Sequence, residues 1–250
     1  TDGVGAGASR LVTGSRPIHK DLEDNLANWL GQESVLLFPS GFQANLAAVI
    51  ALANRHTIVY ADKFVHHSLL LGVKASGAKL QRFAHNDLDD LEKHLKKTQG
   101  ETISNKPIVL TESLFSMEGS SPAIQELAIL CEKYGARLLV DEAHSLGIMG
   151  SRGRGLCYGL SAPITILTGT FGKAFGSGGA FLASSKVTKE HLLQTSGAFR
   201  YSTALAPPLT AAALAALNLI KENSDWGLQL QKRAQRWRSQ LSAEGCTFPP

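Results

Sequence analysis

Cysteine, net charge and long apolar runs are all scarce in this sequence of 250 residues. Its three cysteines lie far apart without CxxC spacing, which argues against a disulfide framework or a zinc motif and favours a reducing compartment. The formal net charge is +4 and the basic residues are scattered, so no nucleic-acid-binding surface is indicated. No apolar run reaches membrane-spanning length. We therefore expect a cytoplasmic protein with no membrane segment, no signal peptide and no metal site.

Strand-like and helix-like patterns alternate along most of the chain. Short apolar runs typical of strands occur at 34–39, 57–62, 79–85, 106–113, 136–144, 163–169 and 178–184. Helix-like segments separate several of them, at 41–53, 66–76, 87–97 and 123–135. This alternation predicts an α/β fold with a mostly parallel sheet flanked by helices. After about residue 205 only helical patterns remain, so we predict a large domain at 1–222 and the start of a smaller, incomplete C-terminal domain at 223–250.

The stretch ILTGTFGKAFGSGGAFL, at 166–182, places one lysine among glycines and small side chains. A lysine in such a loop is more often a solvated surface residue. Here apolar runs that read as buried strands flank the loop, so Lys173 is predicted to lie at a strand end. In open α/β sheets that edge is where ligands bind. Lys173 is therefore a candidate catalytic residue.

A second strand end carries the acidic sequence LLVDEAHS at 138–145. An Asp-Glu-Ala-His box would suit a helicase-type ATPase, but that class requires a phosphate loop of the form GxxxxGK[ST]. The Gly-Lys pair at Gly172–Lys173 is followed by Ala174 and has no leading glycine, so the ATPase hypothesis fails. A GxGxxG dinucleotide fingerprint fails as well, because Phe181 stands where its last glycine would be.

An acid at one strand end and a lysine at another suit a pyridoxal phosphate site. Asp141 would keep the pyridine nitrogen protonated, and Lys173 would carry the cofactor as a Schiff base. Lysine suits this role because its pKa, roughly 10.4 in water, falls readily when the amine is desolvated. The phosphate could lie at the predicted helix start SGF, at 40–42, or beside the hydroxyl of Thr170. Taken alone, Ser40 is better explained as an ordinary helix cap.

Other polar residues gain a functional interpretation only beside this cofactor. His66 could stack on a flat ring, although a histidine at a helix start is more often a capping or core residue. His144, in the acidic motif, and Ser116, after another strand end, could donate to the ring's phenolic oxygen. For Ser116, a turn serine bonded to its own backbone is an equally good explanation. Ser202 and Thr203 precede a proline-initiated helix and could simply cap it.

Several motifs occur together and in order along the chain: SGFQAN, ADKFVHHSLL, FAHND, TESLFSMEGS, LVDEAH, GRG, GTFGKAFG and YSTALAPP. Ordered motifs are far more specific than any one of them. Up to about Pro208 the chain resembles the α-oxoamine synthases, which are fold-type I pyridoxal phosphate enzymes. The resemblance implies the large domain of that fold, pyridoxal 5'-phosphate as cofactor, and a homodimer with the active site between its two subunits.

The resemblance also implies roles for residues of this chain. Lys173 would carry the cofactor and abstract the Cα proton, Asp141 would bind the pyridine nitrogen, and His66 would stack on the ring. Residues that would hold the phenolic-oxygen and phosphate sides of the cofactor are His144, Ser116, Gly41, Phe42 and Thr170. Ser202 and Thr203 would serve the phosphate bound by the partner subunit.

The reaction implied by the resemblance condenses an amino acid with an acyl thioester and releases carbon dioxide. The sequences SGF, AHND and YST favour the family member that joins L-alanine to pimeloyl-CoA or a pimeloyl carrier protein in biotin biosynthesis. The glycine-using member that forms 2-amino-3-ketobutyrate from a CoA thioester is the main alternative. A non-catalytic partner subunit is disfavoured because Lys173 is present. Family members extend beyond both ends of this sequence, and we expect their carboxylate-binding arginine and part of their acyl pocket in those segments.

Overall fold

The structure, a computed structural model, describes residues 3–99 and 105–248. Strands of this part of the chain form one sheet in the order β1-β7-β6-β5-β4-β2-β3. Their bounds are β1 (Ser34–Phe38), β2 (Ile58–Asp62), β3 (Lys79–Phe83), β4 (Ile108–Glu112), β5 (Arg137–Asp141), β6 (Ile166–Thr170) and β7 (Ala180–Ser184). Strands β2 to β6 pair in parallel, whereas β7 is antiparallel to both β1 and β6. The predicted α/β fold with a mostly parallel sheet is confirmed.

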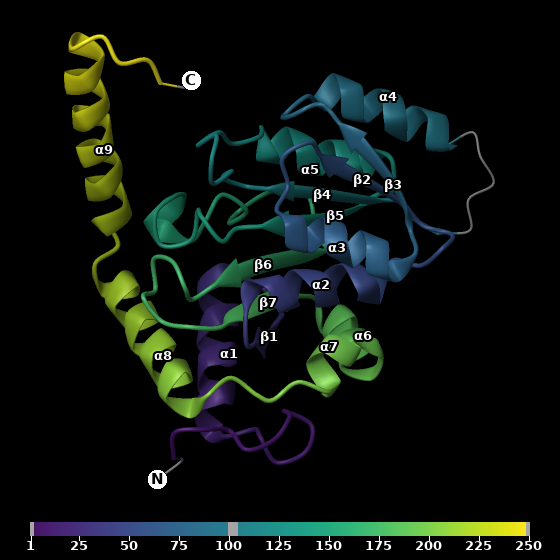
Figure 1. Cartoon of the computed structure of the whole chain (residues 1–250), viewed down its shortest axis with the longest axis vertical. Helices are drawn as coiled ribbons and strands as arrows, with labels where there is room; N and C mark the ends of the chain where they lie inside the picture. The colour runs from purple at the N-terminus through teal and green to yellow at the C-terminus, as the bar shows by residue number, and fades with distance from the viewer. Residues whose placement is uncertain (1–2, 100–104, 249–250) are drawn as a thin grey trace.

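Helices cover both faces of the sheet (Figure 1). Those that pack on one face are α2 (Gly41–Leu52), α3 (His67–Ser76), α6 (Lys186–Thr195) and the short α7 (Gly197–Arg200). Those that pack on the other face are α1 (Pro17–Leu30), α4 (Leu88–Gln99), α5 (Ile124–Lys133) and α8 (Pro207–Glu222). Parallel strands need such crossover connections, and the connections leave a helical layer on each side of the sheet.

The hydrophobic core is divided by the sheet into two clusters. In β1, Val35 and Leu37 belong to one cluster, while Leu36 and Phe38 belong to the other. Successive side chains of a strand point to opposite faces, so a strand covered on both sides is apolar throughout rather than alternating. Strands β1, β2, β4 and β7 are accordingly buried along their whole length, whereas the edge strand β3 is largely exposed.

The connection between β6 and β7 brings the predicted lysine loop to one edge of the sheet. It comprises residues 171–179, which is too short for a helical crossover, so β7 returns antiparallel to β6. This loop leaves from the carboxyl end of β6, beside the carboxyl ends of β4 and β5. The polar residues that follow these parallel strands are therefore gathered at one place.

The structure differs from the sequence-based expectations in several places, and α6 and α7 are among the helices that were not predicted. The run predicted as a strand over 136–144 leaves the sheet at Asp141, and turns follow it. Helix α1 was not predicted, although Pro17 lies at its first position and Gly31 ends it with a left-handed backbone (φ 65°). Both are ordinary helix boundary signals, and they were overlooked because the stretch is rich in polar residues.

The last helix, α9 (Trp226–Ala243), extends away from the body of the molecule (Figure 1). Gly227 is its one buried residue. The predicted division after residue 222 falls between α8 and α9, and the hypothesis that residues 223–250 begin a separate domain stays a prediction. Among the described helices, none combines the length and the apolar character that a membrane crossing requires.

Candidate active site

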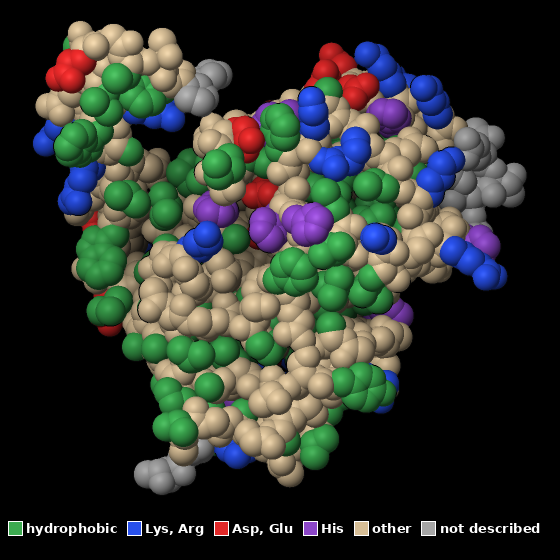
Figure 2. All heavy atoms as spheres, viewed as in Figure 1, with side chains coloured by type: hydrophobic (Ala, Val, Ile, Leu, Met, Phe, Trp, Pro, Cys, Tyr) green, Lys and Arg blue, Asp and Glu red, His purple; other side chains and the backbone are tan. Residues whose placement is uncertain are grey.

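A pocket of about 200 Å³ opens at the carboxyl ends of β4, β5 and β6, next to the first turn of α2. Histidine side chains gather near the middle of the face shown in Figure 2, with a basic side chain beside them. The lining residues are Gly41, Phe42, Asn45, His66, Glu112, Asp141, Ala143, His144, Thr168, Gly169, Thr170 and Lys173. Seven of these were predicted from the sequence: Gly41, Phe42, His66, Asp141, His144, Thr170 and Lys173.

Lys173 is positioned by the loop that joins β6 to β7. The loop is closed by backbone hydrogen bonds from Phe171 to Gly179 (2.9 Å) and from Ser177 back to Phe171 (2.8 Å). Phe171 and Phe175 are buried on either side of the lysine, so the loop is anchored while Lys173 itself stays exposed to the pocket. Within the described residues the Lys173 ammonium has no carboxylate partner.

Asp141 ends β5, and its two carboxylate oxygens are each held by a donor. Oδ1 accepts the backbone N–H of Ala143 at 2.9 Å, and Oδ2 accepts the side-chain amide of Asn45 at 2.7 Å. Asn45 is fixed in turn by Thr168, which donates to its carbonyl oxygen at 2.6 Å. The pocket therefore contains an oriented carboxylate with no basic side chain paired to it among the described residues.

The two pocket histidines have different surroundings. His144 is half-buried; burial, and secondarily the positive charge of Lys173, lower its pKa below the ordinary value for histidine. A neutral imidazole, which keeps one N–H to donate, is therefore the dominant form at pH 7. His66 caps α3: its Nδ1 accepts the backbone N–H of Ser68 at 3.3 Å and lies 2.7 Å from the Ser68 hydroxyl. His66 thus both caps a helix and lines the pocket, as the two interpretations of the sequence allowed.

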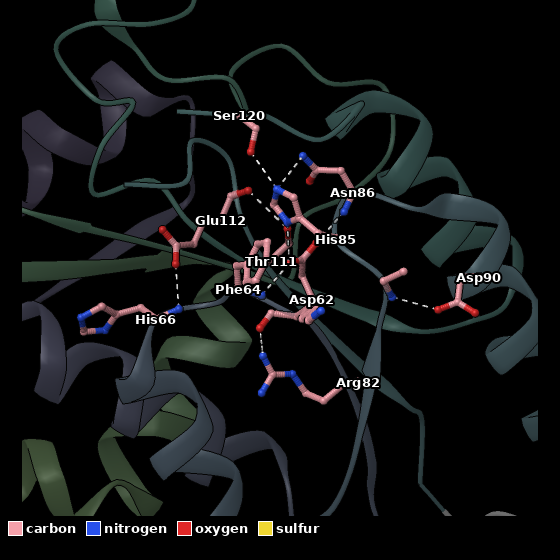
Figure 3. Close-up of polar contacts among 12 residues, drawn as sticks. Asp62, Phe64, His66, Arg82, His85, Asn86, Asp90, Thr111, Glu112 and Ser120 are labelled. Atoms are coloured by element: carbon pink, nitrogen blue, oxygen red, sulfur yellow. Dashed lines mark hydrogen bonds and ion pairs between the residues drawn. The ribbon is translucent and has the colours of Figure 1, made fainter. Parts of the chain in front are cut away.

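The backbone of His66 is held from the neighbouring strand (Figure 3). Its N–H donates to Oε1 of Glu112 at 2.7 Å. At the other end of the same segment, Asp62 accepts the backbone N–H of Phe64 at 2.8 Å and pairs with His85 at 2.8 Å. The turn that carries His66 is therefore tied at both ends to buried carboxyl groups.

The first turn of α2 forms the remaining wall. Ser40 caps the helix by accepting the N–H of Gln43 at 3.2 Å, which confirms the ordinary capping role expected for it. A side chain added to Gly41 would place its Cβ 3.6 Å from Cβ of Thr170, so the glycine leaves open space between the helix start and β6. N–H groups of a first turn have no partner within the helix and attract anions.

Three predicted residues lie outside this pocket. Ser116 is exposed in the turn after β4. Ser202 accepts a hydrogen bond from the Gln43 side chain, and Thr203 forms an antiparallel bridge with Ser9. The contacts of these three residues with a cofactor stay predictions. For Ser202 and Thr203, the predicted contact is with the cofactor in the pocket of a partner subunit.

Five lining residues were missed by the sequence analysis: Asn45, Glu112, Ala143, Thr168 and Gly169. Glu112 is the last residue of β4, and the strand-end argument that selected Asp141 would have found it too. Asn45 stands four residues after Gly41 in α2, a spacing that places both on one face of a helix. Thr168 and Gly169 lie within β6 and Ala143 follows β5, and none of the three carried an individual signal.

Comparison with known proteins places the whole chain in one family. The family model for aminotransferase class I and II matches residues 2–250. The 8-amino-7-oxononanoate synthase of Photobacterium profundum is 42% identical over 90% of this chain, and that of Alkalilimnicola ehrlichii is 39% identical over 99%. These matches cover 57% and 63% of the two relatives, so the chain spans less than two-thirds of their length.

Solved structures agree with these matches. Serine palmitoyltransferase of Sphingomonas wittichii is 30% identical and superposes with a TM-score of 0.93 over 99% of this chain and 62% of its own. An 8-amino-7-oxononanoate synthase of Francisella tularensis, also 30% identical, superposes with a TM-score of 0.81 over 94% of this chain and 68% of its own. The fold is therefore that of the fold-type I enzymes, as the sequence resemblance implied.

Proposed function

The chain belongs to the aminotransferase class I and II family, and on this premise we propose that it is a pyridoxal phosphate-dependent acyltransferase. It joins L-alanine to a pimeloyl thioester, of CoA or of a carrier protein, and yields 8-amino-7-oxononanoate, carbon dioxide and the free thiol. The observation that supports this most strongly is the meeting of Lys173 and Asp141 in one pocket at the strand ends. The names of the relatives support the choice of substrates.

The side chains of the pocket fit pyridoxal phosphate. The cofactor carries an aldehyde, a basic ring nitrogen and a phosphate group, and each has a suitable partner. Lys173 offers an amine, and Asp141 offers a carboxylate held in place by Asn45. The first turn of α2 offers backbone N–H groups, with space at Gly41 that a side chain would fill.

When bound, the cofactor supplies a protonated pyridine ring that delocalises negative charge from the Cα of the amino acid. Asp141 would hold the proton on the ring nitrogen, because Asn45 and the backbone of Ala143 fix its carboxylate in the pocket. The amine of Lys173 would take the proton from Cα of L-alanine. The neutral imidazole of His144 would donate to the phenolic oxygen, and the ring of His66 would cover one face of the site and exclude water there.

The proposal extends to the assembly. Two chains form a homodimer, and Ser202 and Thr203 of each chain hold the phosphate bound by the other. Their position outside the pocket of their own chain is compatible with this arrangement. The residues from 223 onward begin the smaller domain.

The first experiment is to add pyridoxal phosphate to the purified protein and record the visible spectrum before and after borohydride. We expect an absorbance band that borohydride removes, with peptide mapping that places the retained cofactor on Lys173. Lys173→Ala should lose the band, whereas Lys186→Ala, a change at an exposed lysine of α6, should keep it. A label on any other residue would refute the assignment.

The second experiment compares amino acids as substrates. L-Alanine should give thiol release from pimeloyl-CoA, and glycine should give little. Faster release with glycine and acetyl-CoA would instead support the glycine-using reaction, with the same roles for the pocket residues.

A further inference from the structure

A second carboxyl group lines the pocket beside Asp141. Glu112 is the last residue of β4 and stands directly opposite Asp141 in the parallel pairing of β4 with β5. Residues paired in this way present their side chains on the same face of a sheet, on strands that lie about 4.8 Å apart. Both side chains are largely buried, with 5% of Glu112 and 8% of Asp141 exposed.

The two carboxyl groups accept different numbers of hydrogen bonds from the protein. Asp141 receives two N–H donors, one on each oxygen. Glu112 receives one, from the backbone of His66, on Oε1. Figure 3 shows its other oxygen directed away from His66. Asp141 therefore has more hydrogen-bond donors around its carboxyl group than Glu112 has.

The charges that face Glu112 come from several elements. Asp141 on β5, Glu118 in the turn after β4 and Asp62 at the end of β2 are acidic, and all three act against its ionisation. His66, His144 and Lys173 are the basic groups that line the same pocket. Within the described residues none of them forms an ion pair with Glu112. Burial first, and then Asp141, raise the pKa of the Glu112 carboxyl to about 8.

We propose that Glu112 is a positioning residue that stays protonated while the enzyme is active. One oxygen of its carboxyl group holds the backbone of His66, and the other carries the proton, so the pocket has a single negative charge, on Asp141. This inference rests on the proposed function. The carboxylate of an entering amino acid then faces a neutral Glu112 side chain at the end of β4 instead of a second negative charge. The hydrogen bond to the backbone of His66 also keeps the His66 ring in place over the site.

The protonation is tested on the cofactor-free protein with Glu112→Gln, a neutral side chain that can still accept the N–H of His66. Because the pKa of Glu112 is higher in the folded than in the unfolded protein, its stabilising contribution is complete below pH 4.5 and is lost as the pH rises through about 8. Relative to the variant, the ratio of folded to unfolded wild-type protein should therefore fall up to tenfold per pH unit between pH 5 and 8.

Two other acids serve as controls: Glu118→Gln removes a nearby acid outside the pocket, and Glu132→Gln removes a distant one. Because Glu118 helps to raise the pKa of Glu112, its removal should shift the pH dependence slightly but keep most of it, whereas Glu132→Gln, at an exposed position of α5, should follow the wild type. The infrared spectrum of the wild-type protein at pH 7 should contain a protonated-carboxyl band that Glu112→Gln removes. Parallel pH dependences for wild type and Glu112→Gln, or the absence of that band, would overturn the proposal.

The positioning of His66 needs a second pair of variants. Glu112→Val is neutral but cannot accept the N–H of His66, so it should speed hydrogen exchange at that amide and weaken pyridoxal phosphate binding at least tenfold. Glu112→Gln should keep the protection of that amide and an affinity within about threefold of wild type. Unchanged exchange in Glu112→Val would refute the positioning role. If the wild type bound no cofactor, the proposed function would fail, while the measurements on the cofactor-free protein would still decide the state of Glu112.

Discussion

At the residue scale, the chemistry of the pocket depends on how each charged group is supported. Asp141 is an oriented carboxylate because Asn45 and the backbone of Ala143 donate to its two oxygens. The pKa of His144 is lowered by burial and by Lys173, so its imidazole is mainly neutral at pH 7. Residue type alone does not separate these roles, since the sequence contains eight histidines and 21 acidic residues.

Replacement of Asp141 by asparagine should weaken cofactor binding. The variant keeps an oxygen for the Asn45 amide but loses the negative charge that stabilises a protonated ring nitrogen. A charge-assisted hydrogen bond contributes about 1.5–3 kcal/mol, so we expect a dissociation constant for pyridoxal phosphate roughly 10–100-fold higher. Fluorescence titration measures it, with Asp24→Asn on the surface of α1 as the control. An unchanged constant for Asp141→Asn would show that the carboxylate does not face the ring nitrogen.

At the element scale, short connections set the geometry of the site. The loop 171–179 places Lys173 because β7 returns at once beside β6. The segment after β5 is fixed by Glu142, whose Oε1 accepts the backbone N–H groups of Leu156 (2.6 Å) and Cys157 (3.0 Å) and the hydroxyl of Ser145 (3.2 Å). Both connections are held by buried hydrogen bonds together with a few buried apolar side chains, among them Phe171 and Phe175 in the first and Leu146 in the second.

Two glycines of the lysine loop should respond differently to alanine. Gly179 has a φ of +93°, and an added Cβ would lie 2.6 Å from the Leu205 side chain and 3.1 Å from the Phe38 carbonyl oxygen. Gly176 has a φ of +60° with open space around it. We expect Gly179→Ala to cost about 2–4 kcal/mol of unfolding free energy and Gly176→Ala about 1 kcal/mol. Urea unfolding tests this, and equal costs would contradict the crowding at Gly179.

Removal of the Glu142 side chain should release the segment that follows β5. Glu142→Ala leaves two buried backbone N–H groups without their acceptor, which should cost about 3 kcal/mol of unfolding free energy. Glu132→Ala, at an exposed position of α5, should change it by less than about 0.5 kcal/mol. Thermal or urea unfolding of the two variants provides the comparison, and similar values would mean that Glu142 does not anchor the segment.

At the scale of the whole molecule, one sheet with two covered faces holds the pocket, and α9 contributes little to it. Among the residues of α9, Gly227 is buried against the backbone of Ile148. The side-chain amide of Gln231 donates to the carbonyl oxygen of Ile148 at 2.5 Å. Large apolar side chains of this helix remain about half exposed or more, such as Trp237 at 60%.

Deletion of residues from Trp226 onward should therefore leave the sheet and the pocket intact. With so little buried surface lost, we expect the melting temperature to stay within about 4 °C of that of the present chain and unfolding to remain cooperative. Scanning calorimetry measures both, and the cofactor absorbance band reports on the pocket. A much larger decrease would place α9 within the large domain and contradict the predicted boundary after residue 222.

The sequence by itself determined the fold class, the family and most of the pocket. Alternation of apolar strands and helices is a local property, and so are the strand ends at Asp141 and Lys173, so both can be read along the chain. The family was predicted because several short motifs occur in one order, and the family model confirms it. The roles assigned to the individual residues stay predictions.

Only the tertiary structure decided which strand ends are neighbours. Asn45 and Asp141 are 96 residues apart in the chain and meet at 2.7 Å, and Glu112 faces Asp141 because β4 lies next to β5. The same arrangement leaves Ser116, Ser202 and Thr203 outside the pocket of their own chain. Strand order and long-range packing set these distances, and neither leaves a periodic pattern in the sequence, because periodicity encodes which face a residue occupies and not which strand lies beside it.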